Sequence, residues 1–309
     1  MTSTTYLPSI EQGAKLTFEQ NFYMLQQQMK SKLVGAGIAK FVAADGKTHN
    51  MGRLGRTELV EVTGRNPDKQ YSDYSIDNRQ FTKRRFTRTF TLDAKDDINE
   101  LLKDPTSDLL SVLKAAQERV VDRMIIGAGV DSVLVGRPDR QTSSISASAD
   151  GVITVDASSG LTYEKIQEIT QNFNNNELED EMIRGAVFAI TGKENSALMG
   201  EPEFISNDYI SGRPVENGFV DAAGVYRTIR FAGSVNGGIT VANPVLPEAS
   251  TTRSCVVLAP QSVALATEIA SIGLSPNNSK VNSTDITIDF WIGAMRTEGA
   301  KVQIVTTTM

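Results

Sequence analysis

The sequence predicts an α+β fold, in which short strands and helices follow one another without the repeated strand, helix and strand of α/β proteins. Two observations predict strands: apolar residues share one face of the segment 86–92, opposite three threonines, and they recur at every second position in 286–292. A third predicts a long helix, because residues 105–126 carry helix-spaced apolar side chains between a proline and a glycine.

The composition is that of a globular protein large enough to build its own core. The chain has 309 residues, of which 40% are hydrophobic and 22% are charged, and its formal net charge is −6. This length fits one large domain or two moderate ones. The only cysteine, Cys255, lies in an apolar run, so we expect a buried thiol, no intrachain disulfide and no cysteine metal cluster.

The chain also lacks the sequence features of secreted and membrane-spanning proteins. Its first residues carry no basic patch followed by an apolar run, as a signal peptide would. No segment approaches the roughly 18 uninterrupted apolar residues that a membrane span requires. We therefore expect a protein that is made and used in the cytoplasm.

Residues 14–33 follow a polar, threonine-rich tail and predict an amphipathic helix. Their apolar positions recur at spacings of two to four residues, as one face of a helix requires. Gly35 and Gly37 end this helix, and Asp45-Gly46 marks a turn before the next segment. The apolar positions are Leu16, Phe18, Phe22, Leu25, Met29 and Leu33.

Residues 47–95 form a basic segment with the pattern of two extended arms. The segment contains 11 Lys and Arg against 6 Asp and Glu, an excess of +5, in a chain whose total is −6. Asn66-Pro67-Asp68 marks the turn between the arms, and Gly52 and Gly55 weaken the outgoing arm as a strand. The return arm is clearer, because β-favouring residues alternate between two faces. One face carries Phe86, Phe90 and Leu92, and the other carries Thr87, Thr89 and Thr91.

Three interpretations of this basic segment compete. Its charges can face solvent, they can bind acidic surfaces of neighbouring copies of the chain, or they can bind nucleic acid. Cations interleaved with aromatic residues such as Phe81 and Phe86 are typical of nucleic-acid surfaces. The negative charge of the remaining chain favours the second interpretation, because identical copies then supply both the positive arm and the negative body.

Residues 105–126 predict the longest helix. Asp104 suits the N-cap, and Pro105 suits the first helical position because no hydrogen-bond donor is needed there. Gly127 and Gly129 then end the helix. About 22 residues at 1.5 Å each give a rod of roughly 33 Å. Its apolar stripe consists of Leu109, Val112, Leu113, Ala116, Val120 and Met124.

The remaining predicted elements are short. Residues 137–160 are rich in Ser, Gly and Asp and form a surface excursion or paired short strands. The expected helices or helical turns are 162–173, 195–199 and 261–267, and the expected strands are 186–190, 225–231, 255–258, 286–292 and 300–306.

No catalytic or cofactor-binding pattern is present in the sequence. The single histidine, His49, lies in the basic segment, and there is no Gly-x-Ser-x-Gly motif. Gly192-Lys193 lacks the upstream glycine and the following Ser or Thr of a phosphate-binding loop. The acidic run 177–181 lacks the ligand spacing of a calcium loop. We therefore expect no enzyme activity, no cofactor and no metal.

The order of these elements resembles the major capsid proteins of tailed bacteriophages, which have the Hong Kong 97-type fold. Near the C-terminus, Ala294-Met295-Arg296 and residues 299–304 resemble the closing strands of that family. The resemblance divides the chain into an N-terminal arm at 1–46, an extended β-hairpin loop at 47–95, a peripheral domain at 96–184 with its spine helix at 105–126, an axial domain at 185–285, and closing strands at 286–309 that return to the peripheral domain.

This resemblance implies a structural protein of the virion that self-assembles in the host cytoplasm as pentamers and hexamers. The resulting icosahedral shell would enclose the phage genome. The implied partners are other copies of the chain, a separate scaffolding protein, a portal, decoration proteins and double-stranded DNA held without sequence-specific contact, with no membrane. The implied inter-subunit contact residues are Arg53, Arg56, Lys69, Arg79, Lys83, Arg84, Arg85 and Arg88 from the loop, with Phe18, Phe22 and Leu25 from the N-terminal arm.

Two departures from some relatives refine this expectation, and other functions remain open. The chain has no room for a cleavable scaffolding region before the N-terminal arm, which implies a separate scaffold. Lys69 lies near the loop tip, but no partners for a covalent cross-link are identifiable, so none is predicted. The alternatives are an encapsulin-like shell with protein cargo, a decoration or tail-tube subunit, and a nucleic-acid-binding protein that uses the basic arm.

Overall fold

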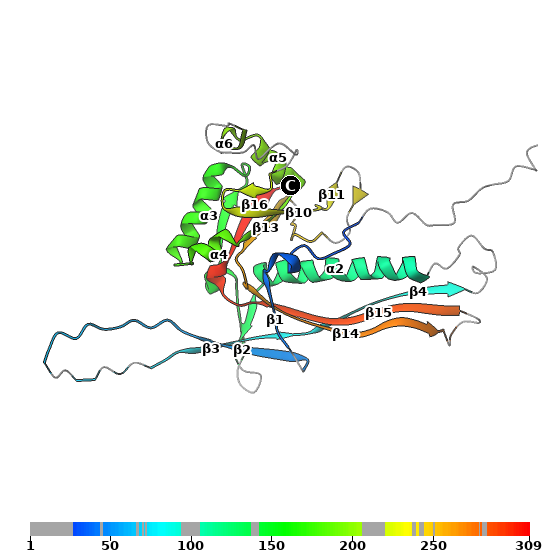
Figure 1. Ribbon diagram of the computed structural model, residues 1–309, viewed down its shortest axis with the longest axis horizontal. Helices are drawn as coiled ribbons and strands as arrows, with labels where there is room; N and C mark the ends of the chain where they lie inside the picture. Colours follow the sequence, from blue (N-terminus) through cyan, green and yellow to red (C-terminus); the bar gives the residue numbers. More distant parts are fainter. Residues whose placement is uncertain are drawn as a thin grey trace, which may run out of the picture.

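The computed structural model places the chain around three larger β-sheets, a two-stranded ribbon and one long helix (Figure 1). Statements about the structure below refer to the residues that it describes. These are residues 27–43, 46–65, 68–69, 71, 73–93, 106–136, 142–205, 220–236, 239–240, 244–249, 251–277, 279 and 283–309.

A long four-stranded sheet forms the base of the molecule, with strand order β1-β14-β15-β4 (Figure 1). β14 and β15 form an antiparallel hairpin, and β4 pairs antiparallel with the other side of β15. β1 adds parallel to the first residues of β14. The strands are β1 Ala39–Phe41, β4 Arg84–Asp93, β14 Val263–Pro276 and β15 Ser283–Arg296.

Helix α2, Thr106–Val130, lies along one face of this sheet (Figure 1). Its Leu113 is buried with Ile286 and Ile288 of β15, and Phe90 of β4 packs against them. The rings of Phe86 and Phe290 stack with centroids 5.7 Å apart. The predicted apolar face of the return arm is thus confirmed for Phe86 and Phe90, since alternate residues of a strand share a face. The side chain of Leu92 lies outside the described residues.

The predicted end of the long helix at Gly127 is wrong, because α2 continues through Gly127 and Gly129 to Val130. Gly129 instead allows close packing: a Cβ atom there would lie 3.3 Å from Leu258 Cδ2. The backbone carbonyl oxygens at the end of α2 also accept hydrogen bonds from a side chain, so the helix needs no glycine cap. Arg296 Nη1 donates hydrogen bonds to the carbonyl oxygens of Ala128, Gly129 and Asp131.

A six-stranded sheet forms the second layer, with strand order β7-β16-β13-β8-β10-β9. Its central strand β8 is buried along its whole length, as expected of a strand covered on both faces. The strands are β7 Ile153–Ala157, β8 Val187–Thr191, β9 Ala222–Ala223, β10 Tyr226–Phe231, β13 Thr252–Leu258 and β16 Val302–Thr308.

Short helices surround this second sheet (Figure 1). The predicted helix at 162–173 corresponds to α3, whose Ile166, Ile169 and Phe173 are buried on one face. Thr191 and Glu194 form a capping box at the start of α5. The helices are α3 Tyr163–Asn175, α4 Asp180–Arg184, α5 Gly192–Met199 and α6 Pro202–Ile205, with 3-10 turns η2 Val34–Ala36, η3 Ser148–Asp150 and η4 Gly299–Lys301.

A third sheet, with order β2-β3-β5-β6, stands where the extended loop leaves the body. β2 pairs antiparallel with β3, and β3 pairs antiparallel with β5. The remaining pair, β11 and β12, is a small ribbon. These strands are β2 Thr48–Leu54, β3 Ile76–Thr82, β5 Val133–Val135, β6 Ser143–Ile145, β11 Val235–Asn236 and β12 Ile239–Thr240.

Several predicted boundaries differ from the structure. The predicted helical turn 261–267 is part of strand β14, which begins at Val263. Residues 27–33, the described end of the predicted helix 14–33, are not helical, and the predicted cap at Asp104-Pro105 lies outside the described residues. The hairpin 47–95 is also shorter than predicted, because β4 pairs with β15 instead of returning along β2.

The closing segment 286–309 contributes strands to two sheets, β15 to the long sheet and β16 to the six-stranded sheet. β16 pairs antiparallel with β13 and parallel with β7, so it belongs to the six-stranded sheet. β14, from the predicted axial segment, instead pairs with β15 in the long sheet. The reason is pairing: seven consecutive residues of β13 and β16 are in register, and most of them are buried.

Candidate inter-subunit surface

The extended loop, residues 48–82, projects from the body along the long axis of the molecule (Figure 1). Thr48 lies opposite Thr82 and Leu54 opposite Ile76 in the antiparallel ladder of β2 and β3. Beyond this ladder lies the loop tip, residues 55–75, whose described residues are exposed and belong to no helix or strand. At the base of the tip, the Gly55 N–H donates a hydrogen bond to the Ser75 carbonyl oxygen at 2.9 Å.

The extended loop carries an unusual number of exposed apolar side chains. Leu59 is fully exposed, and Tyr71 is 89% exposed. Single exposed apolar residues are common, but a concentration of them on one segment marks an interaction surface. The exposed set is Leu54, Leu59, Val60, Val62, Tyr71, Tyr74 and Ile76.

Two ion pairs connect the charges of the loop to its own subunit. Arg53 on β2 pairs with Asp77 on β3 at 2.8 Å. Arg56 reaches Glu177, which follows α3, at 2.7 Å, and both side chains are more than two thirds exposed. Exposed pairs contribute only about 0–1 kcal/mol each, so they orient the loop more than they stabilise it.

A buried cluster of two arginines and one aspartate, the Arg–Asp–Arg cluster, fixes the root of the loop. Arg79 of β3 and Arg296 of β15 are fully buried, and both pair with Asp150 of η3. Arg79 Nη1 lies 3.0 Å from Asp150 Oδ2, and Arg296 Nε lies 2.7 Å from the same oxygen. Arg79 is thus buried against partners within its own subunit, and its role as an inter-subunit contact stays a prediction.

Local backbone geometry positions the aspartate of this cluster. Asp150 ends η3, and Gly151 follows it with a φ of +89°, in the left-handed region that favours glycine. Gly299, at the start of η4, packs so closely that a Cβ atom there would lie 2.0 Å from the carbonyl oxygen of Asp150. The cluster thus joins β3, η3, η4, the end of β15 and, through Arg296, the end of α2.

Lys83 and Arg85 are also paired within the subunit. Lys83 is 5% exposed, and its Nζ lies 2.5 Å from Glu268 Oε2 on β14; its role as an inter-subunit contact also stays a prediction. Arg85 Nη2 lies 2.6 Å from Asp289 Oδ2 across the β4–β15 pair. Hydrogen bonds from Arg85 hold the pKa of Asp289 below its usual value. These internal pairs weaken the interpretation of the arm as a nucleic-acid surface.

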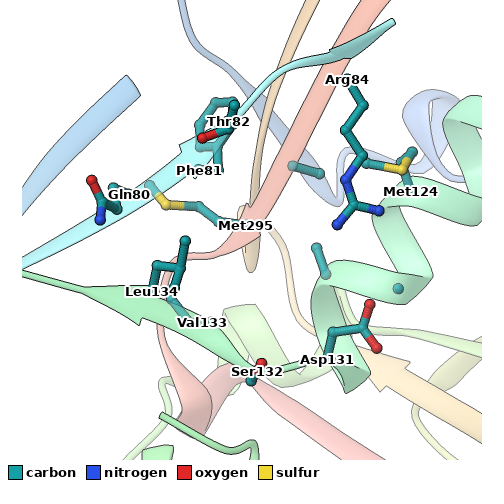
Figure 2. A pocket seen from close by; sticks show the side chains of 13 residues that line it. Gln80, Phe81, Thr82, Arg84, Met124, Asp131, Ser132, Val133, Leu134 and Met295 are labelled. Atoms are coloured by element: carbon teal, nitrogen blue, oxygen red, sulfur yellow. The ribbon is translucent and has the colours of Figure 1, made fainter. Parts of the chain in front are cut away.

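Arg84 faces a pocket of about 340 Å³ between the loop root, α2 and β15 (Figure 2). Its guanidinium lies across this pocket from Asp131, which follows the end of α2 (Figure 2). Within the described part of the chain, Arg84, Arg88 and Lys69 form no ion pair. Of the predicted loop cations, these three remain candidates for contacts with another molecule.

The N-terminal arm is anchored on α2, although Phe18, Phe22 and Leu25 lie outside the described residues. Asp122 is fully buried in the middle of α2. Its carboxylate accepts hydrogen bonds from Ser31 Oγ at 2.6 Å and from the backbone N–H groups of Lys32 and Leu33. Because α2 takes these N–H groups, residues 31–33 do not form the helical hydrogen bonds that the sequence pattern predicts.

The residues that once suggested chemistry have packing roles. The His49 ring lies 5.5 Å from that of Phe81. Cys255 is fully buried, and burial raises the pKa of its thiol. Among the residues that the structure describes, no group of three or more His, Cys, Asp or Glu side chains is placed to hold a metal ion. In the same part of the chain, no helix combines the length and the apolar character that a membrane span requires.

Comparison with known families now connects this architecture to a class of protein. Residues 10–308 match the model of a family described as phage capsid protein. The chain belongs to this phage capsid protein family. It is therefore a structural protein of a virion shell, as the order of its elements suggested. No curated protein sequence matches this capsid protein.

Solved capsid structures share its fold at low sequence identity. The mature capsid of bacteriophage PhiM1 has a TM-score of 0.66 at 11% identity and covers 95% of this chain and 92% of its own. The head of Helicobacter pylori bacteriophage KHP40 has a TM-score of 0.68 at 9% identity, covering 99% of each chain. The capsid of Ralstonia phage GP4 has a TM-score of 0.65 at 9% identity, covering 99% and 98%. The predicted α+β, Hong Kong 97-type fold is confirmed.

Three residues that hold this surface together were not predicted from the sequence: Asp150, Arg296 and Asp122. Asp150 lies in a predicted surface excursion, Arg296 in a predicted closing strand, and Asp122 on the polar side of the predicted long helix. Of the three, only Arg296 could have been recognised from the sequence as a buried charge. It ends an apolar strand, where an arginine is unusual. The other two gain their meaning from partners more than 70 residues away.

Proposed function

We propose that this capsid protein is the major shell subunit of a tailed phage, and that it assembles as pentamers and hexamers into an icosahedral shell around double-stranded DNA. The observation that carries the proposal is the family match from residue 10 to residue 308. The protein acts through assembly, without catalysis or a cofactor. Assembly takes place in the host cytoplasm, with a separate scaffolding protein and a portal as partners.

In this proposal the extended loop lies over a neighbouring subunit. It supplies exposed apolar side chains and three cations that form no ion pair with the described residues, Lys69, Arg84 and Arg88. Arg53, Arg56 and Arg85 keep the loop and β4 aligned with their own subunit and contact the neighbour with the exposed parts of their side chains. Phe18, Phe22 and Leu25 of the N-terminal arm add apolar contacts at a second boundary between subunits.

Electron microscopy of the purified protein, alone and with its scaffolding protein, tests the proposal. We expect closed icosahedral particles or rings of five and six subunits, and nuclease-protected DNA inside particles purified from infected cells. A single monomeric species under all of these conditions would overturn the proposal. Particles that hold a protein cargo and no DNA would instead support an encapsulin-like shell.

The charged part of the proposal has its own test. The double variant Arg84→Glu with Arg88→Glu should leave a folded subunit, because both side chains are exposed and neither forms an ion pair with the described residues. We expect it to form particles poorly. The matched control Arg227→Glu with Lys193→Glu changes the same number of charges on the six-stranded sheet and its helix, and it should affect the loop contact little.

A further inference from the structure

The pocket at the root of the extended loop has the size and shape of a small-molecule site. Its volume of about 340 Å³ lies at the lower end of the roughly 300–1,000 Å³ that is typical of such sites (Figure 2). Its walls come from segments distant in the sequence: the end of β3 and the start of β4, the C-terminal turns of α2, the start of β5 and the end of β15. The fold as a whole therefore forms this pocket.

The inner wall of the pocket is apolar and buried. Phe81, Val133 and Met295 line it and are 5%, 4% and 3% exposed. The unbranched side chain of a methionine adapts its shape to what it contacts. On the side of α2, Gly127 has no side chain to fill the space, and a Cβ atom there would meet only Asp131 Oδ2, at 3.5 Å. A short apolar group of a ligand can therefore pack against this inner wall.

Two opposite charges face each other at the rim of the same pocket. The guanidinium of Arg84 lies on one side and the carboxylate of Asp131 on the other (Figure 2). Both residues are exposed, and within the described part of the chain neither side chain forms a hydrogen bond or an ion pair. They are too far apart to pair with each other, so a ligand that satisfies both must carry an anionic and a cationic group.

A free amino acid with an apolar side chain meets all of these conditions. Its carboxylate can accept two parallel hydrogen bonds from the guanidinium of Arg84. Its ammonium group carries three donors for the carboxylate of Asp131. A ligand with a single charge would leave one rim group without a partner, and a nucleic acid would place phosphates against Asp131. The chemistry of the rim therefore selects a small zwitterion.

We propose that this pocket binds a zwitterion of the apolar amino-acid class, with its carboxylate on Arg84, its ammonium group on Asp131 and its side chain against Phe81 and Met295. Arg84 is the first residue of β4, and Asp131 follows the last residue of α2. The bound molecule thus connects the root of the loop to the long helix. This inference goes beyond the shell function, because it concerns the single subunit and holds or fails whether or not particles form.

Ligand-detected nuclear magnetic resonance on the full-length, unassembled subunit tests the proposal, with L-leucine as the probe. We expect a dissociation constant on the order of 1 mM, because both ion pairs are exposed and the apolar contact is small. Three analogues each lack one feature: N-acetyl-L-leucine the ammonium group, L-leucinamide the carboxylate, and glycine the apolar side chain. Each should bind at least threefold more weakly. Equal binding of all these compounds, or no binding of L-leucine at about 20 mM, would overturn the proposal.

Variants of the two rim residues assign each charge of the ligand to its partner. Arg84→Gln and Asp131→Asn should keep a folded subunit, because both side chains are exposed, and each should weaken L-leucine at least threefold. Arg84→Gln should then bind L-leucine and L-leucinamide equally, and Asp131→Asn should bind L-leucine and N-acetyl-L-leucine equally. The matched control Arg88→Gln removes an exposed charge of the same strand outside the pocket and should change the affinity less than twofold. A preference for L-leucine over L-leucinamide that survives Arg84→Gln would overturn the assignment.

Thiol labelling locates the bound molecule, because the only native cysteine, Cys255, is fully buried and leaves a clean background. Ser132→Cys places a thiol on the pocket wall, and saturating L-leucine should slow its reaction with a small thiol reagent at least threefold. The control Asn50→Cys, exposed on β2 outside the pocket, should react at the same rate with and without L-leucine. Binding of L-leucine that leaves the labelling of Ser132→Cys unchanged would place the ligand elsewhere, and the proposal would fail.

Discussion

Replacement of Asp150 by Asn should destabilise the subunit more than almost any other change of a single charge. The carboxylate of Asp150 is 4% exposed and serves two guanidinium groups, those of Arg79 and Arg296, which are both fully buried. Asp150→Asn keeps the shape of the side chain but removes its charge. Arg79 then keeps only the longer contact of its Nε with Asp77 Oδ2 at 3.7 Å, and Arg296 loses the carboxylate with which it pairs.

The expected magnitude follows from the burial of the three groups. Removing one partner of a buried ion pair costs about 3–5 kcal/mol, because the remaining charge loses its compensation. The amide oxygen of Asn still accepts one hydrogen bond, and Arg296 keeps its contacts with the end of α2, so we expect about 3–4 kcal/mol. This is a large part of the roughly 5–15 kcal/mol that stabilises a typical folded protein.

Urea unfolding of the unassembled subunit measures this loss. The fluorescence of Trp291, the only tryptophan, reports on β15, whose last residue is Arg296. Asp131→Asn is the matched control, because Asp131 is exposed and its side chain forms no ion pair with the described residues; it should change the stability by less than about 0.5 kcal/mol. A loss of under about 1 kcal/mol for Asp150→Asn would refute the reasoning.

Two further predictions concern the close packing around the loop root and the anchor of the N-terminal arm. Gly299→Ala should prevent accumulation of soluble subunit, since its Cβ atom would meet the carbonyl oxygen of Asp150 at 2.0 Å, whereas Gly273→Ala, with nothing within 4 Å, should fold normally; equal yields of both proteins would contradict this. Asp122→Ala should cost about 2–3 kcal/mol and speed proteolysis near residue 30 severalfold, because it leaves the N–H groups of Lys32 and Leu33 without their acceptor; an unchanged digestion pattern would argue against the anchor.

The sequence predicted those strands and helices whose apolar faces follow from the spacing of residues close together in the chain. Phe86, Phe90 and the alternating residues of 286–292 lie on the predicted apolar face, because the two-residue period of a strand is a property of the strand itself. The long helix α2 was predicted for a similar reason, because its apolar residues recur at helical spacing over many turns of the sequence. Its end was not, because the donor that satisfies the last carbonyls is Arg296, more than 160 residues away.

The function of the charged residues could not be predicted locally, because composition counts charges without their partners. Arg79, Lys83 and Arg84 look alike in sequence, yet Arg79 and Lys83 are buried in ion pairs and Arg84 faces a pocket. What distinguishes them is which residue the fold brings opposite each one. Arg79 pairs with Asp150 and Lys83 with Glu268, whereas Arg84 faces Asp131 across the pocket without forming an ion pair with the described residues. The count of +5 in the segment 47–95 therefore overstated the charge available to a partner.

The distribution of partners suggests two separate physical roles along the loop. Near the root, ion pairs and the Arg–Asp–Arg cluster have their effect within the subunit, where burial strengthens them and salt screens them little. At the tip, exposed apolar side chains such as Leu59 and Val62 lie among exposed charged ones, and salt does not screen the attraction between apolar surfaces. A loop contact carried by these apolar side chains should hold shells together at high ionic strength, whereas a contact carried by Lys69, Arg84 and Arg88 should weaken there. Particle yield measured against salt concentration therefore separates the apolar from the charged part of the proposed interface.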